Sequence, residues 1–226
     1  MTAGNLLISS LNLGQLIQAA GDFRYLLNRG YPRSTSLTLV GNRYNLEHKE
    51  RQLLQRGVFD DATAGRRAVQ RQTLGNLTGC ALALDGHNVL ITLECGLRGV
   101  PLIEADDGFI RDIGEVSRTY RTSSFSEQAL LLVTQHLCNY QVYPVYVWYD
   151  APLSHSGELA QRTREIFHSY GLAGEAWAIP VPEKELLAFE GVVATSDTAI
   201  IDQVSQVADV AGEILRSRPG IQIISL

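Results

Sequence analysis

The chain predicts an α/β fold, in which a three-layer α/β/α domain with a mostly parallel sheet follows a small α-helical N-terminal module. Beyond about residue 75, short apolar runs alternate with helix-like segments of roughly 10 to 18 residues, which is typical of parallel strands covered by helices. Before that point, helix-like segments follow one another without a strand pattern. We therefore expect two domains, 1–75 and 76–226.

In the first domain, apolar spacing and stop signals predict several short helices. Residues 1–20 are apolar and uncharged, and residues 22–30 end at a glycine that precedes Tyr-Pro. A capped turn is expected in 34–44, and 46–56 combines a charged face with an apolar stripe. Residues 60–75 have no strong apolar period, so we expect them to connect the domains.

In the second domain, strands and helices are expected in alternation. The expected strands are 80–85, 100–105, 142–149, 176–181, 192–194 and 221–224, the last of which would close the sheet. The expected helices are 88–96, 123–139, 157–170, 183–189 and 199–216, the last of which would be the longest.

Charge is divided unevenly along the chain. Residues 1–75 carry ten Lys and Arg against five Asp and Glu, whereas residues 76–226 carry nine against nineteen. This asymmetry suits a basic module that meets a polyanion and an acidic domain that gathers metal ions, although a helical surface with scattered arginines explains it equally well. The helical module is thus expected to bind nucleic acid or to dock a partner, with Arg29, Arg33 and Arg43 as the nucleic-acid-binding residues.

The sequence contains no pattern typical of a membrane helix or a signal peptide. No apolar run reaches the roughly 18 residues of a membrane helix, and the N-terminus lacks a signal-peptide pattern. Cys80, Cys95 and Cys138 are odd in number and widely spaced, which indicates thiols in a reducing compartment. We expect a cytoplasmic protein with no membrane partner, and homo-oligomerisation stays open.

Three apolar runs each end in an aspartate, namely Asp85, Asp150 and Asp197. The carboxyl ends of neighbouring parallel strands share one edge of a sheet, so these carboxylates are expected to converge as catalytic residues. Taken singly, an aspartate after a strand is more often a turn or capping residue. Converging carboxylates repel one another unless a cation neutralises them, and oxygen ligands favour Mg²⁺ or Mn²⁺. We expect Asp112, from a second acidic cluster with Asp106 and Asp107, as a fourth metal ligand.

Substrate-binding residues are expected around this acidic site. Asn88 could bind substrate, although a role in fixing its loop is favoured two to one. Arg111 could contact a phosphate or pair with Asp112. Ser154 and Ser156 precede a helix whose N-terminus could hold a phosphate, although helix capping is the simpler explanation for both. Ser196 could cap a helix or orient a phosphate.

Other enzyme classes lack their sequence signatures. The chain has no Gly-x-Ser-x-Gly elbow, no P-loop and no Asp-x-Asp at the first strand, which argues against serine hydrolases, P-loop nucleotide binding and aspartate-nucleophile phosphatases.

The acidic motifs resemble those of the PIN-like nuclease superfamily, including its NYN branch. The resemblance covers roughly residues 78–226 and is carried by Leu84-Asp85-Gly86-His87-Asn88-Val89, Tyr149-Asp150-Ala151 and Ala194-Thr195-Ser196-Asp197. It implies a three-layer nuclease that hydrolyses RNA with an aspartate cluster and a divalent metal. Many members carry an acid in the helix after the first strand, where this chain offers Glu94.

The whole chain also resembles domain of unknown function 434, with a C-terminal part like domain of unknown function 5616. This resemblance implies no activity. It is carried by Arg29-Gly30-Tyr31-Pro32, Leu39-Val40-Gly41-Asn42-Arg43-Tyr44, Asp106-Asp107-Gly108 with Arg111-Asp112, and Ser154 with Ser156-Gly157-Glu158.

The sequence therefore predicts a hydrolase of phosphodiester bonds, a Mg²⁺- or Mn²⁺-dependent ribonuclease whose N-terminal module helps to bind RNA. The alternative is a non-catalytic nucleic-acid- or protein-binding module that keeps the PIN-like fold.

Overall fold

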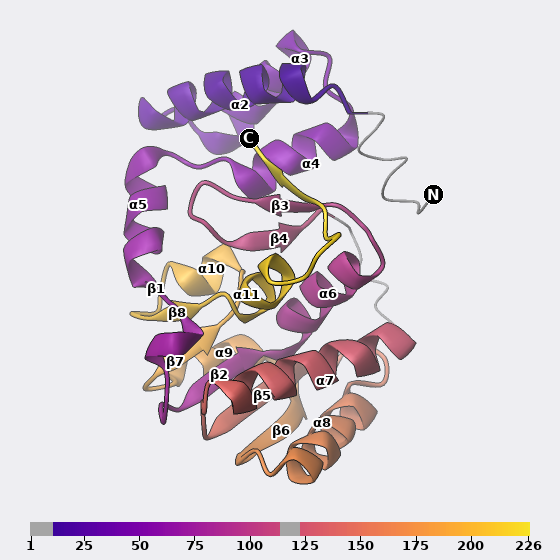
Figure 1. The fold of residues 1–226 in the computed structure, drawn as a ribbon. Helices are drawn as coiled ribbons and strands as arrows, with labels where there is room; N and C mark the ends of the chain where they lie inside the picture. The colour runs from indigo at the N-terminus through magenta and orange to yellow at the C-terminus, as the bar shows by residue number, and fades with distance from the viewer. Residues whose placement is uncertain (1–10, 114–122) are drawn as a thin grey trace.

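The computed structural model describes residues 11–113 and 123–226. Figure 1 shows the N-terminal helices at one end of the molecule, the layers of the large sheet at the other and a small sheet between them. The α/β fold class expected from the sequence is confirmed. Within the described ranges, no helix combines the length and the apolar character needed to cross a bilayer.

The large sheet has six strands, and every neighbouring pair in it is parallel. Its strand order is β1-β8-β7-β2-β5-β6. The strands are β1 (Arg71–Gln72), β2 (Leu82–Asp85), β5 (Val145–Asp150), β6 (Gly174–Ile179), β7 (Val192–Ala194) and β8 (Val207–Ala208).

Strand β2 lies in the middle of this sheet because its side chains are apolar on both faces. Leu82 and Leu84 enter the larger hydrophobic core, whereas Ala83 enters a second core on the opposite face. Helices cover both faces, which gives the three layers. The helices α6 (Gly86–Leu97), α7 (Ser124–Asn139), α8 (Ser156–Tyr170) and α11 (Val210–Arg216) contribute to the first core, and α9 (Pro182–Ala188) and α10 (Thr198–Ile201) to the second.

The N-terminal helices differ from the expected helices in three places. A single helix, α2 (Leu13–Asn28), replaces the two expected within 1–20 and 22–30, and residues 1–10 lie outside the described residues. The expected connection at 60–75 contains a helix, α5 (Asp61–Gln70), which the Asp60 side chain caps at Thr63 N. Helix α3 (Arg33–Arg43) is a full helix without a side-chain cap, where only a capped turn was expected. Helix α4 (His48–Gly57) matches the expectation, and a 3₁₀ turn spans Leu74–Asn76.

Two expected strands of the large sheet form a separate sheet instead. Strand β3 (Leu102–Glu104) pairs antiparallel with β4 (Ile110–Asp112) and parallel with β9 (Ile223–Ser225). The small sheet has apolar side chains on both faces. Leu102 packs in the larger core, whereas Ile103 and Ile224 pack with the N-terminal helices. Apolar surface on both neighbours thus buries Leu102, Ile103 and Ile224 in this separate sheet.

The expected long helix at 199–216 is also wrong. Helix α10 ends at Ile201, Val207 and Ala208 join the large sheet as β8, and Asp209 then caps α11 by accepting a hydrogen bond from Gly212 N. The apolar residues Val207 and Ala208 are fully buried in the sheet, and this burial overrides the helical spacing of the segment.

Candidate active site

The strand order places a switch point at the carboxyl end of β2. After β2 the chain continues to β5 on one side, and β7 later pairs with the other side. Open α/β sheets bind their ligands at such a point, beyond the carboxyl ends of the strands. Asp85 ends β2, Asp150 ends β5, and Asp197 lies just after β7, so the structure brings the three predicted aspartates to this edge.

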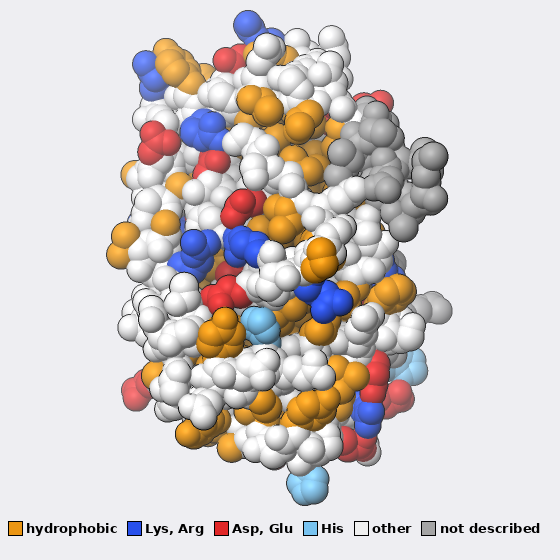
Figure 2. Space-filling view, viewed as in Figure 1, with side chains coloured by type: hydrophobic (Ala, Val, Ile, Leu, Met, Phe, Trp, Pro, Cys, Tyr) orange, Lys and Arg blue, Asp and Glu red, His pale blue; other side chains and the backbone are white. Residues whose placement is uncertain are grey.

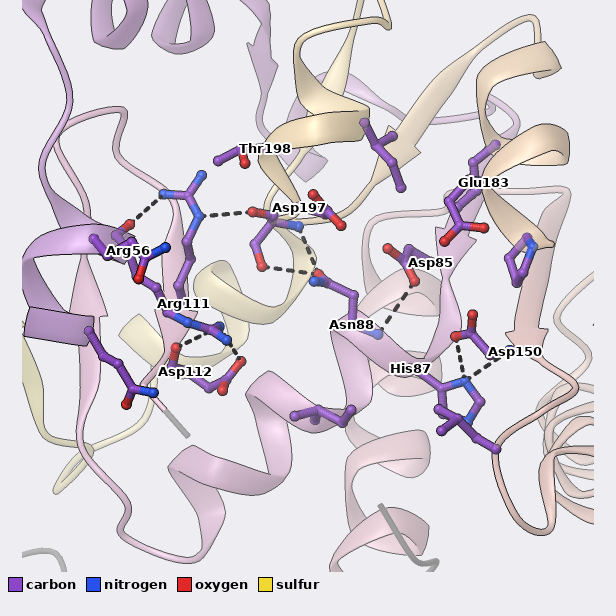
Figure 3. A pocket seen from close by; sticks show the side chains of 18 of the residues that line it. Arg56, Asp85, His87, Asn88, Arg111, Asp112, Asp150, Glu183, Asp197 and Thr198 are labelled. Atoms are coloured by element: carbon purple, nitrogen blue, oxygen red, sulfur yellow. Dashed lines mark hydrogen bonds and ion pairs between the residues drawn. The ribbon is translucent and has the colours of Figure 1, made fainter. Parts of the chain in front are cut away.

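A cleft of about 670 Å³ opens at this edge. The α/β layers line one part of it, and the helical module and small sheet line the rest. Its wall contains, among others, Arg33, Gln52, Gln55, Arg56, Phe59, Asp85, His87, Asn88, Arg111, Asp112, Asp150, Glu183, Ser196, Asp197 and Thr198. Figure 3 shows Asp85, Asp150 and Glu183 at one end and Arg56, Arg111 and Asp112 at the other, with Asn88 between them.

Asp85 is buried at the acidic end of the cleft. Thr195 Oγ1 donates a hydrogen bond to its Oδ2 atom at 2.8 Å, and Asn88 N approaches its Oδ1 atom at 3.4 Å. Burial raises the pKa of the Asp85 carboxyl from 3.8 to about 7, and the negative charges of Asp150 and Asp197 add to this increase. In the described part of the chain, no Lys, Arg or His side chain forms an ion pair with Asp85.

Asn88 and Ser196 hold the ends of β2 and β7 together. The backbone N–H and the hydroxyl of Ser196 both donate to Asn88 Oδ1, at 2.8 and 3.0 Å. The Ser196 carbonyl accepts a hydrogen bond from Arg111 Nε at 2.8 Å. These contacts support the loop-fixing role that the sequence favoured for Asn88, while both side chains still line the cleft.

Asp150 contacts His87 next to Asp85. The buried His87 ring lies edge-on to Tyr149, and its Nδ1 atom is 3.0 Å from both Asp150 Oδ2 and Asp150 N. One ring nitrogen serves one of these contacts at a time: protonated Nδ1 donates to the carboxylate, whereas unprotonated Nδ1 accepts from the backbone N–H. His87 therefore orients Asp150 in either state.

Glu183 is a cleft residue that the sequence interpretation missed. It lies in the first turn of α9, and Figure 3 shows its side chain at the same end of the cleft as Asp85. The signal was present, because the strand expected at 176–181 ends just before it and the other acidic residues also follow strands. Asp197 caps α10 through Ala199 N, so it combines the capping role with a position on the cleft.

Asp112 and Arg111 lie apart from the three aspartates. Arg56 Nη1 donates to both the carbonyl and the Oδ2 atom of Asp112, at 3.0 and 3.3 Å. Arg111 forms a two-pronged pair with buried Asp107 at 2.8 Å for each hydrogen bond. Both predicted residues line the basic end of the cleft, and in this conformation their charges are balanced by these partners.

The other predicted residues occupy several environments. Arg33 lines the cleft, whereas Arg29 stacks on Tyr25 and exposed Arg43 lies 3.4 Å from Asp22. On the face drawn in Figure 2, basic side chains of the helical end are scattered among acidic and apolar ones. Ser154 is exposed, and buried Ser156 donates to the Ala151 carbonyl at the start of α8. Neither serine belongs to the cleft wall.

Glu94 and Asp106 have structural partners elsewhere. Ser126 Oγ donates to Glu94 at 2.7 Å where α6 meets α7, so the acid of the helix after β2 lies outside the cleft wall. Asp106 accepts two hydrogen bonds from Arg24, at 2.8 and 2.7 Å, which fastens α2 to the loop after β3.

The acidic end offers oxygen ligands of the kind that Mg²⁺ and Mn²⁺ prefer. The described residues contain no group of three His, Cys, Asp or Glu side chains arranged closely enough to hold a metal ion. Magnesium usually binds one or two carboxylates, with waters and substrate phosphates completing its shell. The buried, uncompensated Asp85 fits such a loosely held cation better than a fully enclosed one.

Known proteins similar to this chain carry no assigned activity. The model for "Protein of unknown function (DUF434)" matches residues 15–69, and that for "Domain of unknown function (DUF5616)" matches residues 74–213. "Uncharacterized protein MJ0935" of Methanocaldococcus jannaschii is 33% identical over 200 residues, which cover 88% of this chain and 95% of that protein. No solved structure gives a significant match. The second domain model spans more than half of the chain, including all three strand-end aspartates, and on this basis the protein belongs to the DUF5616 family.

Proposed function

We propose that the protein is a metal-dependent phosphodiesterase of the PIN-like type that cleaves RNA. The observation that carries the proposal is Asp85, a buried carboxylate at a sheet switch point, whose ionisation Asp150 and Asp197 oppose and which no positive side chain balances in the described residues. A buried acid without a balancing charge is costly to maintain, which favours a functional explanation.

The carboxylates would divide the work of binding a metal ion. Asp85 and Asp150, at the ends of adjacent strands, would be the main ligands, with Asp197 and Glu183 near enough to the same end to hold metal-bound water. Bound Mg²⁺ or Mn²⁺ would make water more acidic and stabilise the charge that develops on an attacked phosphate. Thr195 and His87 would orient Asp85 and Asp150.

Charge across the cleft favours a phosphodiester substrate. Asp85, Asp150 and Glu183 lie at one end, and Arg56 and Arg111 lie at the other with Asp112. Arg33 shares the Phe59 ring with Arg111 and so belongs to the same end. A polyanion could therefore meet a cation at the acidic end and guanidinium groups at the basic end. The PIN-like resemblance is consistent with this arrangement, because the residues that carry it are those at the ends of β2, β5 and β7.

The alternative proposal is a non-catalytic binding module that keeps this fold. It is favoured by the finding that no three potential ligands are close enough together in the described residues to hold a metal ion. In that case the cleft would bind RNA or protein, Asp85 and Asp197 would serve as helix caps, and Asp150 would serve as the partner of His87.

Incubation of the purified protein with a mixed RNA pool and Mg²⁺ or Mn²⁺ separates the two proposals. We expect cleavage by the wild type, and loss of about a thousandfold in rate for Asp85→Asn, because one transition-state interaction commonly contributes that much. Asp22→Asn, which changes an aspartate on α2 outside the cleft wall, should cleave like the wild type. Absence of both cleavage and calorimetric metal binding would reject the enzyme in favour of the binding module.

A further inference from the structure

Arg33 differs from the other two arginines of the cleft wall. Arg56 pairs with Asp112 and Arg111 pairs with Asp107, but Arg33 forms no ion pair in the described residues. Its guanidinium group donates to the carbonyl of Gln55, a neutral acceptor. The basic end of the cleft therefore contains one guanidinium group without an ion-pair partner in the described residues, and the more distant charges of Asp60 and Asp106 offset its positive charge only in part.

The surroundings of Arg33 make this positive charge unfavourable. The guanidinium carbon of Arg33 lies 4.7 Å from the centre of the Phe59 ring. The guanidinium carbons of Arg67 and Arg111 lie 4.5 and 5.3 Å from the centre of the same ring. Burial, followed by the positive charges of Arg67 and Arg111, lowers the pKa of Arg33 to about 10. An anion at this position would relieve both effects.

The nearby acids are already engaged. Asp60 accepts a hydrogen bond from Thr63 N at the start of α5. Asp106 accepts two hydrogen bonds from Arg24 and a third from Phe59 N at 2.9 Å. The anion that would balance Arg33 is thus expected to come from a ligand in the cleft, whose wall Arg33 shares with the aspartates.

We propose that Arg33 binds a second phosphate of the substrate, one that is not cleaved, so that the site takes nucleotide chains with at least two phosphates. The planar guanidinium group matches phosphate oxygens in a two-pronged contact. A volume of about 670 Å³ is in the range of ligand sites and suits a dinucleotide. This inference rests on the proposed function, because the first phosphate would lie at the acidic end.

The two ends of the cleft come from different parts of the chain. Arg33 belongs to the helical module matched by the DUF434 model, whereas Asp85 and Asp150 belong to the part matched by the DUF5616 model. A substrate that reaches from one phosphate position to the other would therefore contact both parts. Both matched parts of the chain would therefore contribute residues to one substrate site.

Binding of short ribonucleotides in the presence of Ca²⁺ tests the proposal, because a cation at the acidic end keeps the first phosphate there. Chromatography of the probes after the measurement shows that they are intact. The probes are UpU, which has one phosphate, and pUpU and UpUp, which add a second at either end. We expect the wild type to bind pUpU or UpUp at least about tenfold more tightly than UpU, since charged hydrogen bonds contribute enough for such a ratio. Arg33→Gln should remove this preference, and Arg33→Lys should keep only part of it.

Arg164→Gln is the matched control, because it removes an exposed arginine on α8 that pairs with Glu175 outside the cleft. It should keep the full preference. The preference should also weaken with added salt in the wild type, since phosphate contacts release counterions. Melting curves confirm that each variant is folded, and Arg33→Lys keeps the positive charge while it removes the guanidinium group that lies over Phe59.

The outcomes distinguish this proposal from the proposed function. Equal binding of all three probes by the wild type, or an unchanged preference in Arg33→Gln, overturns the second phosphate position even if RNA is cleaved. A preference that depends on Arg33 supports it even if no RNA is cleaved.

Discussion

The two ends of the cleft differ in whether a buried aspartate has a positively charged partner. At the basic end, Asp107 is fully buried but accepts hydrogen bonds from Arg67 and Arg111 at 2.8 to 3.0 Å. At the acidic end, Asp85 is also buried but has a hydroxyl and a backbone N–H as its neighbours. Two buried aspartates therefore differ in their partners: Asp107 joins elements of the fold through ion pairs, whereas Asp85 has no charged partner among the described residues and is the metal ligand that we propose.

Asp107→Asn is the change with the largest expected effect on stability. Burial opposes the charge of Asp107, but hydrogen bonds from Arg111 and Arg67 hold its pKa below the ordinary value. Removing one partner of a buried ion pair leaves the others uncompensated, which costs about 3–5 kcal/mol. Urea denaturation should show this loss; a change below about 1 kcal/mol would contradict the assigned role.

Asp85→Asn should have the opposite effect in the absence of metal. The pKa of Asp85 is raised in the folded protein, so wild-type stability falls as pH rises from about 4 to 7, where the folded carboxyl ionises. At pH 8 in EDTA, we expect the variant to be more stable by roughly 2–4 kcal/mol, and the difference should vanish near pH 4. A variant that is less stable at pH 8 would remove the distinction between the two ends.

Metal ions should stabilise the wild type and not Asp85→Asn. A ligand that binds only the folded state stabilises it by about 2.7 kcal/mol at a hundredfold excess over its dissociation constant. Thermal melting with Mn²⁺, Mg²⁺ and EDTA measures this effect. The same increase in both proteins would place the metal away from Asp85.

Glu183→Gln should have the smallest effect, a loss of about tenfold in RNA cleavage, equivalent to about 1.4 kcal/mol. Glu183 lines the acidic end, but it is exposed and forms no hydrogen bond with the aspartates in the described residues, so its contribution should be partial. Glu185→Gln on the same helix is the control, since Glu185 is exposed outside the cleft wall. Equal rates for the two variants would remove Glu183 from the site.

The sequence predicted the acidic end better than the basic end. Asp85, Asp150 and Asp197 follow runs long enough to be identified as strands, and parallel strands necessarily bring their carboxyl ends to one edge. No pattern in the sequence around Arg33 or Arg56 indicates that these residues lie near that edge. Their position depends on how α3 and α4 pack on the small sheet, which is a tertiary property.

The small sheet escaped prediction for a related reason. Strands β3, β4 and β9 have three residues each, too few for alternation to indicate which sheet they join.

The break of the expected helix at 199–216 has another cause. Apolar spacing there fits a helix, but Val207 and Ala208 gain more by completing a buried sheet, with Asp209 capping a new helix.

Strand β9 has a consequence for the order of events during synthesis. Ile224 packs among the N-terminal helices, and the carbonyl of Leu226 accepts a hydrogen bond from Arg24, 202 positions earlier. The helices emerge first from the ribosome, yet the surface on which they dock is finished only when this strand has been translated. We expect stalled chains that lack residues 223–226 to be cut by protease within α2–α4, and full-length released chains to resist. Equal resistance of both would show that docking does not wait for β9.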